Sequence, residues 1–261
     1  MTDSTTRQKN IQVYAENYND PCTYGAYEVR DKLLIFSSIL NSLKHFGTGR
    51  VLDVGFGTGD LLIHCARKGY ECYGIDVVSS AATILRERSN YPLNLFTGEA
   101  TKLPFDSDYF DLVVCSHVLE HIENDALALS EIKRVLKKSG LAILGVPSFG
   151  SRENELHYRE YSRVSFAKLI NGWQVFQFAG YGSWLLQSIM LWRNALTHIS
   201  RANDAGNKCV AAAEGSPRFR MFYQAFMVPA LLFLLYLDNK QPFFKGNPME
   251  IWAVIRKIQN E

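Results

Sequence analysis

The sequence predicts an α/β fold built on an open, doubly wound sheet of mostly parallel strands. Short apolar runs rich in Val, Ile and Leu alternate with amphipathic stretches of helical length, starting near Arg50 and continuing to Val146. Strands buried on both faces read as continuous apolar runs, and a helix that connects two parallel strands covers one face of the sheet. These two observations together predict an α/β domain with helices on both faces of its sheet.

The expected elements follow from where each apolar run begins and ends. A helical preface over 29–45 comes first. In the alternating region the expected strands are 51–54, 72–75, 93–96, 110–115 and 141–146, and the expected helices are 60–68, 79–88 and 124–137. After Pro147 the pattern is less regular, with a helix expected at 165–171 and strands at 175–179 and 250–256.

The charge balance and the cysteines exclude several classes of protein. Lys and Arg total 28 against 26 for Asp and Glu, without a dense basic run, so nucleic acid is not expected as a partner. The 5 cysteines are scattered without C-x-x-C spacing, which indicates reduced thiols, and no metal site is predicted. Residues 1–7 are polar and contain no apolar run, so we expect no secretory signal and a cytoplasmic protein.

A glycine-rich turn follows the first expected strand, in the segment Val51-Leu-Asp-Val-Gly-Phe-Gly-Thr-Gly-Asp60. Glycines between a strand and a helix let the backbone turn tightly and approach a ligand closely. A dinucleotide-binding turn would read G-x-G-x-x-G, whereas here Asp53 precedes the turn and Asp60 follows it. Carboxylates repel a pyrophosphate and attract a cation. The turn therefore favours a positively charged nucleoside over a nicotinamide dinucleotide.

A second acidic position strengthens this interpretation. Asp76 ends the second expected strand, 17 positions after Gly59, where a carboxylate can accept hydrogen bonds from both hydroxyls of a ribose. Two further polar segments follow the third and fourth expected strands, at 98–106 and 116–122. We expect all of them to meet at the carboxyl edge of the sheet.

Together these segments resemble the motif set of class I S-adenosylmethionine (SAM)-dependent methyltransferases, in particular the small-molecule branch that includes the ubiquinone and menaquinone biosynthesis methyltransferases. The resemblance covers residues 48–147. It implies a Rossmann-like sheet of seven strands whose last strand, over 250–256, is antiparallel. It also implies SAM as the cofactor and methyl transfer by in-line displacement.

The resemblance also implies which residues hold the cofactor. Asp53 and the glycines would surround the methionine part, Asp76 with Val77 the ribose, Glu99 with Ala100 the adenine, and Ser116 with His117 the sulfonium. Tyr14 and Tyr18 either close over the cofactor or only join the preface to the sheet. The implied cofactor residues are Tyr14, Tyr18, Asp53, Gly55, Gly57, Gly59, Asp76, Val77, Glu99, Ala100, Ser116 and His117.

Three histidines are candidates for a general base, which contributes only when the methyl acceptor must lose a proton. They are His117, His121 and His157. For His121 the alternative is a buried or capping side chain, and for His157 it is a solvated loop.

The predicted organisation has three parts: a helical cap over 1–47, a SAM-binding domain over 48–182 and 247–261, and a helical insertion over 183–246 that shapes the acceptor pocket. The apolar stretch at 221–237 is short for a membrane span, which needs about 20 residues. We interpret it as a buried or substrate-lining helix, a homodimer contact, or a peripheral surface that touches a membrane or lipid.

The predicted reaction is methylation of a hydroxyl on a small, partly apolar metabolite or lipid-linked sugar, with nitrogen or carbon acceptors as alternatives. Two other classes stay open at this point. One is a non-catalytic SAM-binding sensor or partner subunit, and the other is a nicotinamide oxidoreductase.

Overall fold

The fold was analysed in a computed structural model, which describes residues 8, 11–16, 36–37, 39–40, 49–148, 156–181 and 250–258. Strands and helices alternate through most of this range, as the sequence predicts. In chain order the elements are β1 (Arg50–Val54), α3 (Asp60–Arg67), β2 (Glu71–Asp76), α4 (Ser79–Arg88), β3 (Leu93–Thr97), β4 (Phe110–Ser116), the 3₁₀ helix η1 (Leu119–His121), α5 (Asp125–Val135), β5 (Leu136–Pro147), α6 (Arg163–Leu169), β6 (Trp173–Tyr181) and β7 (Glu250–Lys257).

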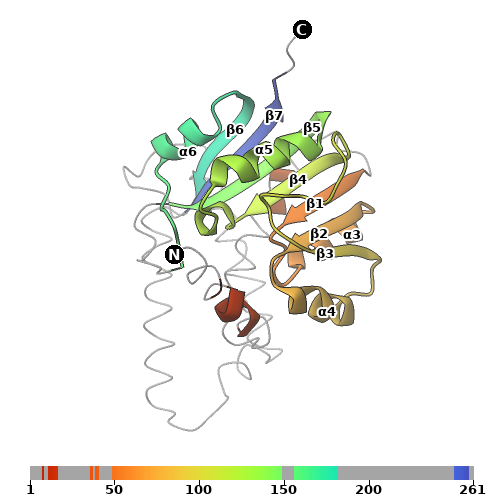
Figure 1. The fold of residues 1–261 in the computed structure, drawn as a ribbon. Helices are drawn as coiled ribbons and strands as arrows, with labels where there is room; N and C mark the ends of the chain where they lie inside the picture. The colour runs from red at the N-terminus through yellow and green to blue at the C-terminus, as the bar shows by residue number, and fades with distance from the viewer. Residues whose placement is uncertain are drawn as a thin grey trace, which may run out of the picture.

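The strands form one 7-stranded sheet in the order β3-β2-β1-β4-β5-β7-β6 (Figure 1). The pairs from β3 through β5 are parallel, and β7 runs antiparallel to both β5 and β6. The predicted Rossmann-like fold with an antiparallel last strand is confirmed. Because the chain winds outward from β1 in one direction and from β4 in the other, the crevice between their carboxyl ends is where such sheets bind ligands.

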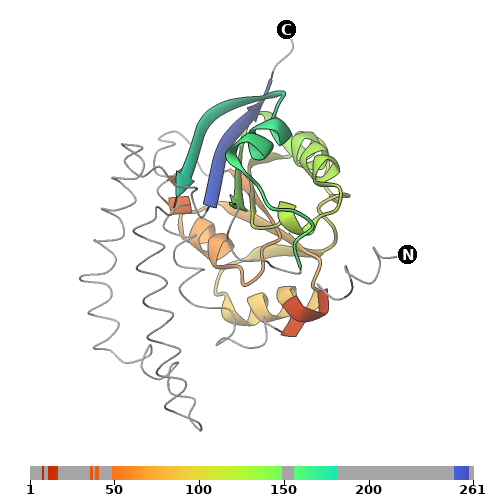
Figure 2. The ribbon, with the colours of Figure 1, turned by 90° about the vertical axis from the view of Figure 1, so that its left-hand side faces the viewer.

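Two apolar layers cover the sheet, one on each face. Along β4, Leu112 and Val114 pack with α3 and α4, whereas Val113 and Cys115 pack with α5 and α6. Figure 2 shows α3 and α5 on opposite sides of the sheet. The same alternation runs along β5 and β7, because successive side chains of a strand point to opposite faces. This burial on both faces explains why the strands read as continuous apolar runs.

Several boundaries differ from those expected. The structure places the end of α5 at Val135 and the start of β5 at Leu136, directly after it, whereas the sequence suggests a helix to residue 137 and a strand from 141. Leu136 is fully buried and pairs with Phe110, so the polar stretch after it belongs to the strand. Helix α6 begins at Arg163 because the preceding Ser162 forms a capping box with Ser165.

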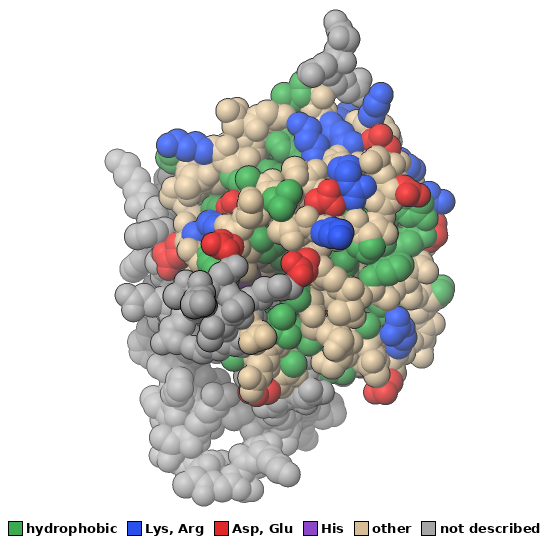
Figure 3. Space-filling model, in the orientation of Figure 1, with side chains coloured by type: hydrophobic (Ala, Val, Ile, Leu, Met, Phe, Trp, Pro, Cys, Tyr) green, Lys and Arg blue, Asp and Glu red, His purple; other side chains and the backbone are tan. Residues whose placement is uncertain are grey.

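Several expectations fall outside the described residues: Tyr18, most of the preface helix, the insertion over 183–246 and its apolar stretch. Of the preface, Phe36 and Ile39 are described and are buried in the same layer as α3 and α4. None of the described helices has the length and apolar character to span a lipid bilayer. Basic and acidic side chains are interspersed on the described part of the face in Figure 3.

Candidate active site

A cavity of about 460 Å³ lies at the carboxyl ends of the central strands, in the size range of small-molecule sites. It brings together most of the residues that the sequence analysis singled out. Its wall includes Tyr14, Asp53, Gly55, Gly57, Asp76, Val77, Glu99, Ala100, Ser116, His117 and His121. Gly59 and His157 are not part of this wall. Tyr18 lies outside the described residues.

The glycine turn has two kinds of glycine. Gly55 has a φ of 73°, and a Cβ built there would lie 2.3 Å from Val118 Cγ2, so only glycine fits beside the cavity. Gly59 caps α3 with a φ of 75°, and its Cβ would meet Leu85 Cδ2 at 2.2 Å. Gly59 therefore serves the close contact between α3 and α4 rather than the cavity surface.

Asp76 ties this turn to the end of β2. It is almost fully buried, and its Oδ2 accepts a hydrogen bond from the Gly57 N–H at 2.9 Å while its Oδ1 accepts one from the Val78 N–H at 2.9 Å. Each carboxylate oxygen has a second lone pair, so both oxygens can still accept hydrogen bonds from a ligand in the cavity. The two hydrogen bonds thus fix the Asp76 side chain at the position that would hold a ribose in the family that the sequence resembles.

The two acidic residues that flank the glycine turn, Asp53 and Asp60, carry less free negative charge than the sequence suggests. Burial, together with the charge of Asp76, raises the pKa of Asp53 to about 8, so its carboxyl group is protonated at neutral pH. Asp60 accepts a hydrogen bond from Thr58 Oγ1 at 2.6 Å and pairs with Arg88 at 3.1 Å. The expected repulsion of a pyrophosphate is therefore weaker than it would be from two free carboxylates.

Two polar residues with unusual surroundings lie at the end of β4, which finishes at Ser116, and directly after it at His117. Ser116 Oγ and His117 Nε2 are buried, and neither atom has a hydrogen-bond partner among the described residues. His117 has a left-handed φ of 55°, its N–H donates to Gly145 O at 2.9 Å, and its Nε2 lies 3.4 Å from Glu250 Oε1. A buried hydroxyl in a cavity wall that lacks a partner among the described residues fits a bound ligand as its partner.

The remaining polar groups gather around η1. His121 Nδ1 lies 3.0 Å from the carbonyl oxygen of Leu156, so Nδ1 donates its proton there and Nε2 accepts a hydrogen bond from Tyr14 Oη at 2.9 Å. The His157 ring packs edge to face on His121, with 4.7 Å between ring centroids. Burial, helped by the nearby His117, lowers the pKa of His157.

Glu120 also belongs to this group, although the sequence analysis did not single it out. Its side chain is 1% exposed, and its Oε1 lies 3.7 Å from His117 Nδ1 and 3.7 Å from His121 Nε2. Its place between two candidate histidines in the segment His117-Val-Leu-Glu-His121 is the signal that could have pointed to it.

Residues 52–144 match the family described as a methyltransferase domain. This stretch is a class I SAM-dependent methyltransferase domain. The family and the cofactor predicted from the sequence are thereby confirmed for this domain, whereas the roles predicted for single residues stay predictions.

Two curated relatives of the methyltransferase domain illustrate the similarity. An uncharacterized methyltransferase of Bacillus subtilis, YcgJ, is 30% identical over 148 residues, which are 55% of this chain and 54% of the relative. The ubiquinone/menaquinone biosynthesis C-methyltransferase UbiE of Neisseria meningitidis is 33% identical over 140 residues, which are 50% of this chain and 55% of the relative. The chain spans about half the length of these relatives.

Among solved structures, a SAM-dependent methyltransferase from Mesorhizobium loti matches with a TM-score of 0.54. The match covers 86% of this chain and 98% of that protein at 14% identity. It supports the fold alone.

Proposed function

We propose that the protein transfers the methyl group of SAM to a hydroxyl of a small, partly apolar acceptor. The observation that carries this proposal is the cavity of the methyltransferase domain, which is lined by Asp76 at the end of β2 and by Ser116 at the end of β4, on either side of β1 and its glycine turn. We assign the ribose to Asp76, the adenine to Glu99 and the backbone of Ala100, and the methionine part to Ser116 and His117. Bound there, SAM would supply an electrophilic methyl group.

The acceptor's apolar character follows from the rest of the cavity wall. Ile11, Ile122 and Leu127 give an apolar surface to the same cavity as His121, beside the charged Glu123 and the polar Asn124. Residues 183–246, which we propose as a helical insertion, would complete this side. The UbiE relative is named a C-methyltransferase of ubiquinone and menaquinone biosynthesis, so a carbon of a quinone-like ring is the alternative acceptor atom.

We assign to His121 the role of the base that accepts the acceptor's proton. Its Nδ1–H is held by the Leu156 carbonyl, so Nε2 keeps a lone pair toward Tyr14 and the cavity. A positioned base of this kind contributes roughly 10²–10⁴-fold to the rate. Orientation of the two reacting groups contributes more, roughly 7–11 kcal/mol of the barrier.

The test is incubation of the purified chain with SAM and pools of hydroxylated, apolar metabolites. We expect release of S-adenosylhomocysteine together with an acceptor whose mass has risen by one methylene group. The variant His121→Ala should lose most of this rate and keep its affinity for SAM. A protein that binds SAM but releases no S-adenosylhomocysteine with any pool would instead be a SAM sensor or a partner subunit.

A further inference from the structure

We propose that Glu120, His121 and His157 form a binding site for one first-row divalent metal ion beside the cavity. One ligand atom from each of the three side chains lies within 4.8 Å of the other two. This inference rests on the proposed function, because the metal would bind and ionise the acceptor's hydroxyl. No metal site is apparent from the sequence, since residue 157 meets η1 only in the folded chain.

The spacing suits a metal with nitrogen and oxygen ligands. His121 Nε2 lies 3.7 Å from Glu120 Oε1. Two ligands about 2.1 Å from a tetrahedral metal are about 3.4 Å apart, so a small rotation of the side chains brings both into coordination distance. The His157 ring already packs edge to face on His121. Two imidazoles and one carboxylate are a ligand set that catalytic zinc sites use.

The backbone holds the two contributing segments together. The Tyr158 N–H donates to the Glu120 carbonyl oxygen at 2.8 Å, and the Arg159 guanidinium donates to the carbonyl oxygens of Ile122 and Glu123. The ligands therefore come from a rigid platform, and binding of a metal requires side-chain rotation alone.

A second feature typical of metal ligands is the hydrogen bond on the far side of His121. Metal-binding histidines commonly donate their other ring N–H to a carbonyl or carboxylate, which fixes the ring and the tautomer. Here the Nδ1–H of His121 donates to Leu156 O at 3.0 Å. The Tyr14 hydroxyl, 2.9 Å from Nε2, must give up its hydrogen bond when a metal binds.

The buried carboxylate supports a cation at this position. Glu120 is 1% exposed and has His117 and His121 as neighbours at 3.7 Å, and a carboxylate in such a buried group of imidazoles can bind a metal ion together with them. Three protein ligands leave coordination positions open for the acceptor. With a metal bound, His121 Nε2 would be a ligand and could not act as the base, so the metal would take over that role. An acceptor hydroxyl bound to it would lose its proton to solvent near neutral pH, and its oxygen anion would then attack the methyl group and release S-adenosylhomocysteine. The acceptor class is thus a metal-binding hydroxyl compound, best with two adjacent oxygens.

The test uses the full chain without an affinity tag, treated with a chelator and then titrated with Co²⁺ by visible absorption and with Zn²⁺ by calorimetry. We expect one equivalent of metal and the absorption of a cobalt ion bound to nitrogen ligands. His157→Ala and Glu120→Gln should each weaken binding of both metals at least tenfold. Tyr14→Phe should tighten it a few-fold, because the competing hydroxyl is gone.

His64→Ala is the matched control, since His64 is also partly buried but bonds Ser37 at 3.0 Å in the layer of α3. It should bind Co²⁺ like the unchanged protein. Affinity for SAM, measured separately without metal, reports on folding and on the proposed function, and His157→Ala should leave it unchanged because His157 is not in the cavity wall. Equal and weak Co²⁺ binding by all variants, with SAM affinity intact, would overturn the metal site and leave the proposed function standing.

Discussion

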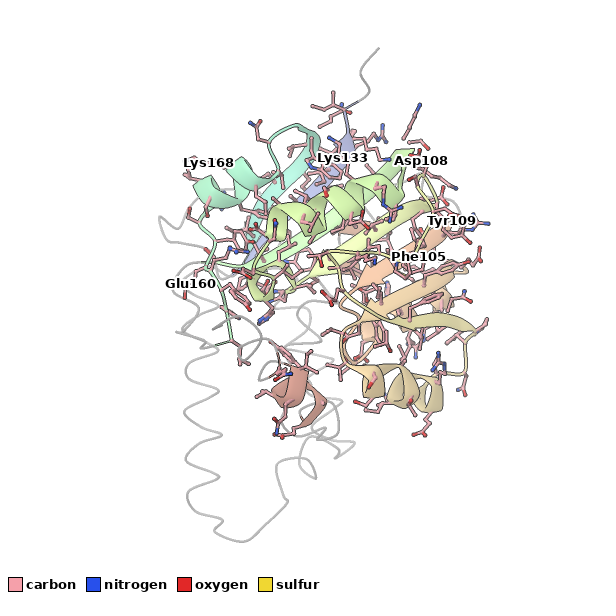
Figure 4. All side chains as sticks on the ribbon, viewed as in Figure 1. Phe105, Asp108, Tyr109, Lys133, Glu160 and Lys168 are labelled. Carbon is pink, nitrogen blue, oxygen red and sulfur yellow. The ribbon has the colours of Figure 1, made fainter. Side chains whose placement is uncertain are left out.

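The charged residues have different surroundings at the two edges of the sheet, the one formed by the amino ends of its parallel strands and the one formed by their carboxyl ends. At the amino edge, where Figure 4 labels Asp108 and Tyr109, acidic groups are paired within the chain: Lys257 Nζ lies 2.7 Å from Asp108 Oδ1, and Lys137 Nζ lies 2.8 Å from Asp111 Oδ1. At the carboxyl edge, on the side where Figure 4 labels Glu160, the cavity gathers buried polar groups and the left-handed residues Gly55 and His117.

The pKa values follow the same division. The hydrogen bond from Lys257 lowers the pKa of Asp108, and at Asp111 the bonds from Lys137 and Arg50 lower the pKa although burial opposes them. At the carboxyl edge burial raises the pKa of Asp53 instead. The comparison teaches that ion pairs hold the acidic groups of the amino edge in the charged form, whereas burial dominates at the carboxyl edge, where the Ser116 hydroxyl lacks a hydrogen-bond partner among the described residues.

The largest expected effect is on SAM affinity, which should depend on an acidic residue of the carboxyl edge and not on one of the amino edge. Asp76→Ala removes the hydrogen bond that holds the glycine turn at Gly57, the one that holds Val78 at the start of α4, and both acceptors proposed for the ribose. Hydrogen bonds to a charged group are worth about 1.5–3 kcal/mol each, so SAM affinity measured by calorimetry should fall about 100-fold or more. The control at the other edge, Asp111→Asn, should bind SAM with unchanged affinity. Unchanged affinity in Asp76→Ala would remove the basis of the comparison.

The second effect concerns the pH dependence of stability. Asp53 has a folded-state pKa of about 8, well above the value of 3.8 for an exposed Asp, so between these pH values the folded state keeps a proton that the unfolded state has released. The contribution of Asp53 to the free energy of unfolding therefore falls as pH rises through this window, by up to about 1.4 kcal/mol per pH unit.

The asparagine side chain of Asp53→Asn cannot ionise, so this variant lacks the decrease in the free energy of unfolding with pH that Asp53 causes. In urea unfolding without ligand, its stability relative to the unchanged protein should increase from about pH 5 to about pH 8 and then level off. A constant difference between the two proteins over that range would show that the Asp53 carboxyl group is not protonated in the folded state.

The smallest expected effect is at the amino edge. Asp111→Asn weakens the bonds from Lys137 Nζ and from the Arg50 N–H, both at 2.9 Å or less, and should lower the free energy of unfolding by about 1–2 kcal/mol. Glu71→Gln, at the exposed pair with Arg50, should cost less than about 1 kcal/mol. A larger loss of stability in Glu71→Gln than in Asp111→Asn would contradict the ranking by burial.

How far the sequence predicts the molecule depends on how local each signal is. The strands were predictable because burial on both faces produces apolar runs, and α4 was predicted with its observed bounds. The start of β5 was not predicted, because Leu136 is followed by Lys137-Lys-Ser-Gly140, which resembles a turn unless its pairing with β4 is known.

The residues of the site likewise divide into those that local sequence signals predict and those that they do not. Asp76 was predictable from its spacing to the glycine turn, since both follow neighbouring strands. The meeting of Glu120 with His157 was not, because it depends on the path of the chain after β5 and on the contact between the Tyr158 N–H and the Glu120 carbonyl oxygen. The raised pKa of Asp53 likewise depends on burial, which no local pattern reveals.

The most direct test of the central claim is a crystal structure of the chain grown with SAM or S-adenosylhomocysteine. The account predicts electron density in the cavity at the carboxyl ends of β1 and β4, with the ribose hydroxyls on Asp76 and the amino acid end near Ser116. Density for a phosphate-bearing ligand in that position, or a cavity closed by the chain's own side chains while SAM binds elsewhere, would contradict it.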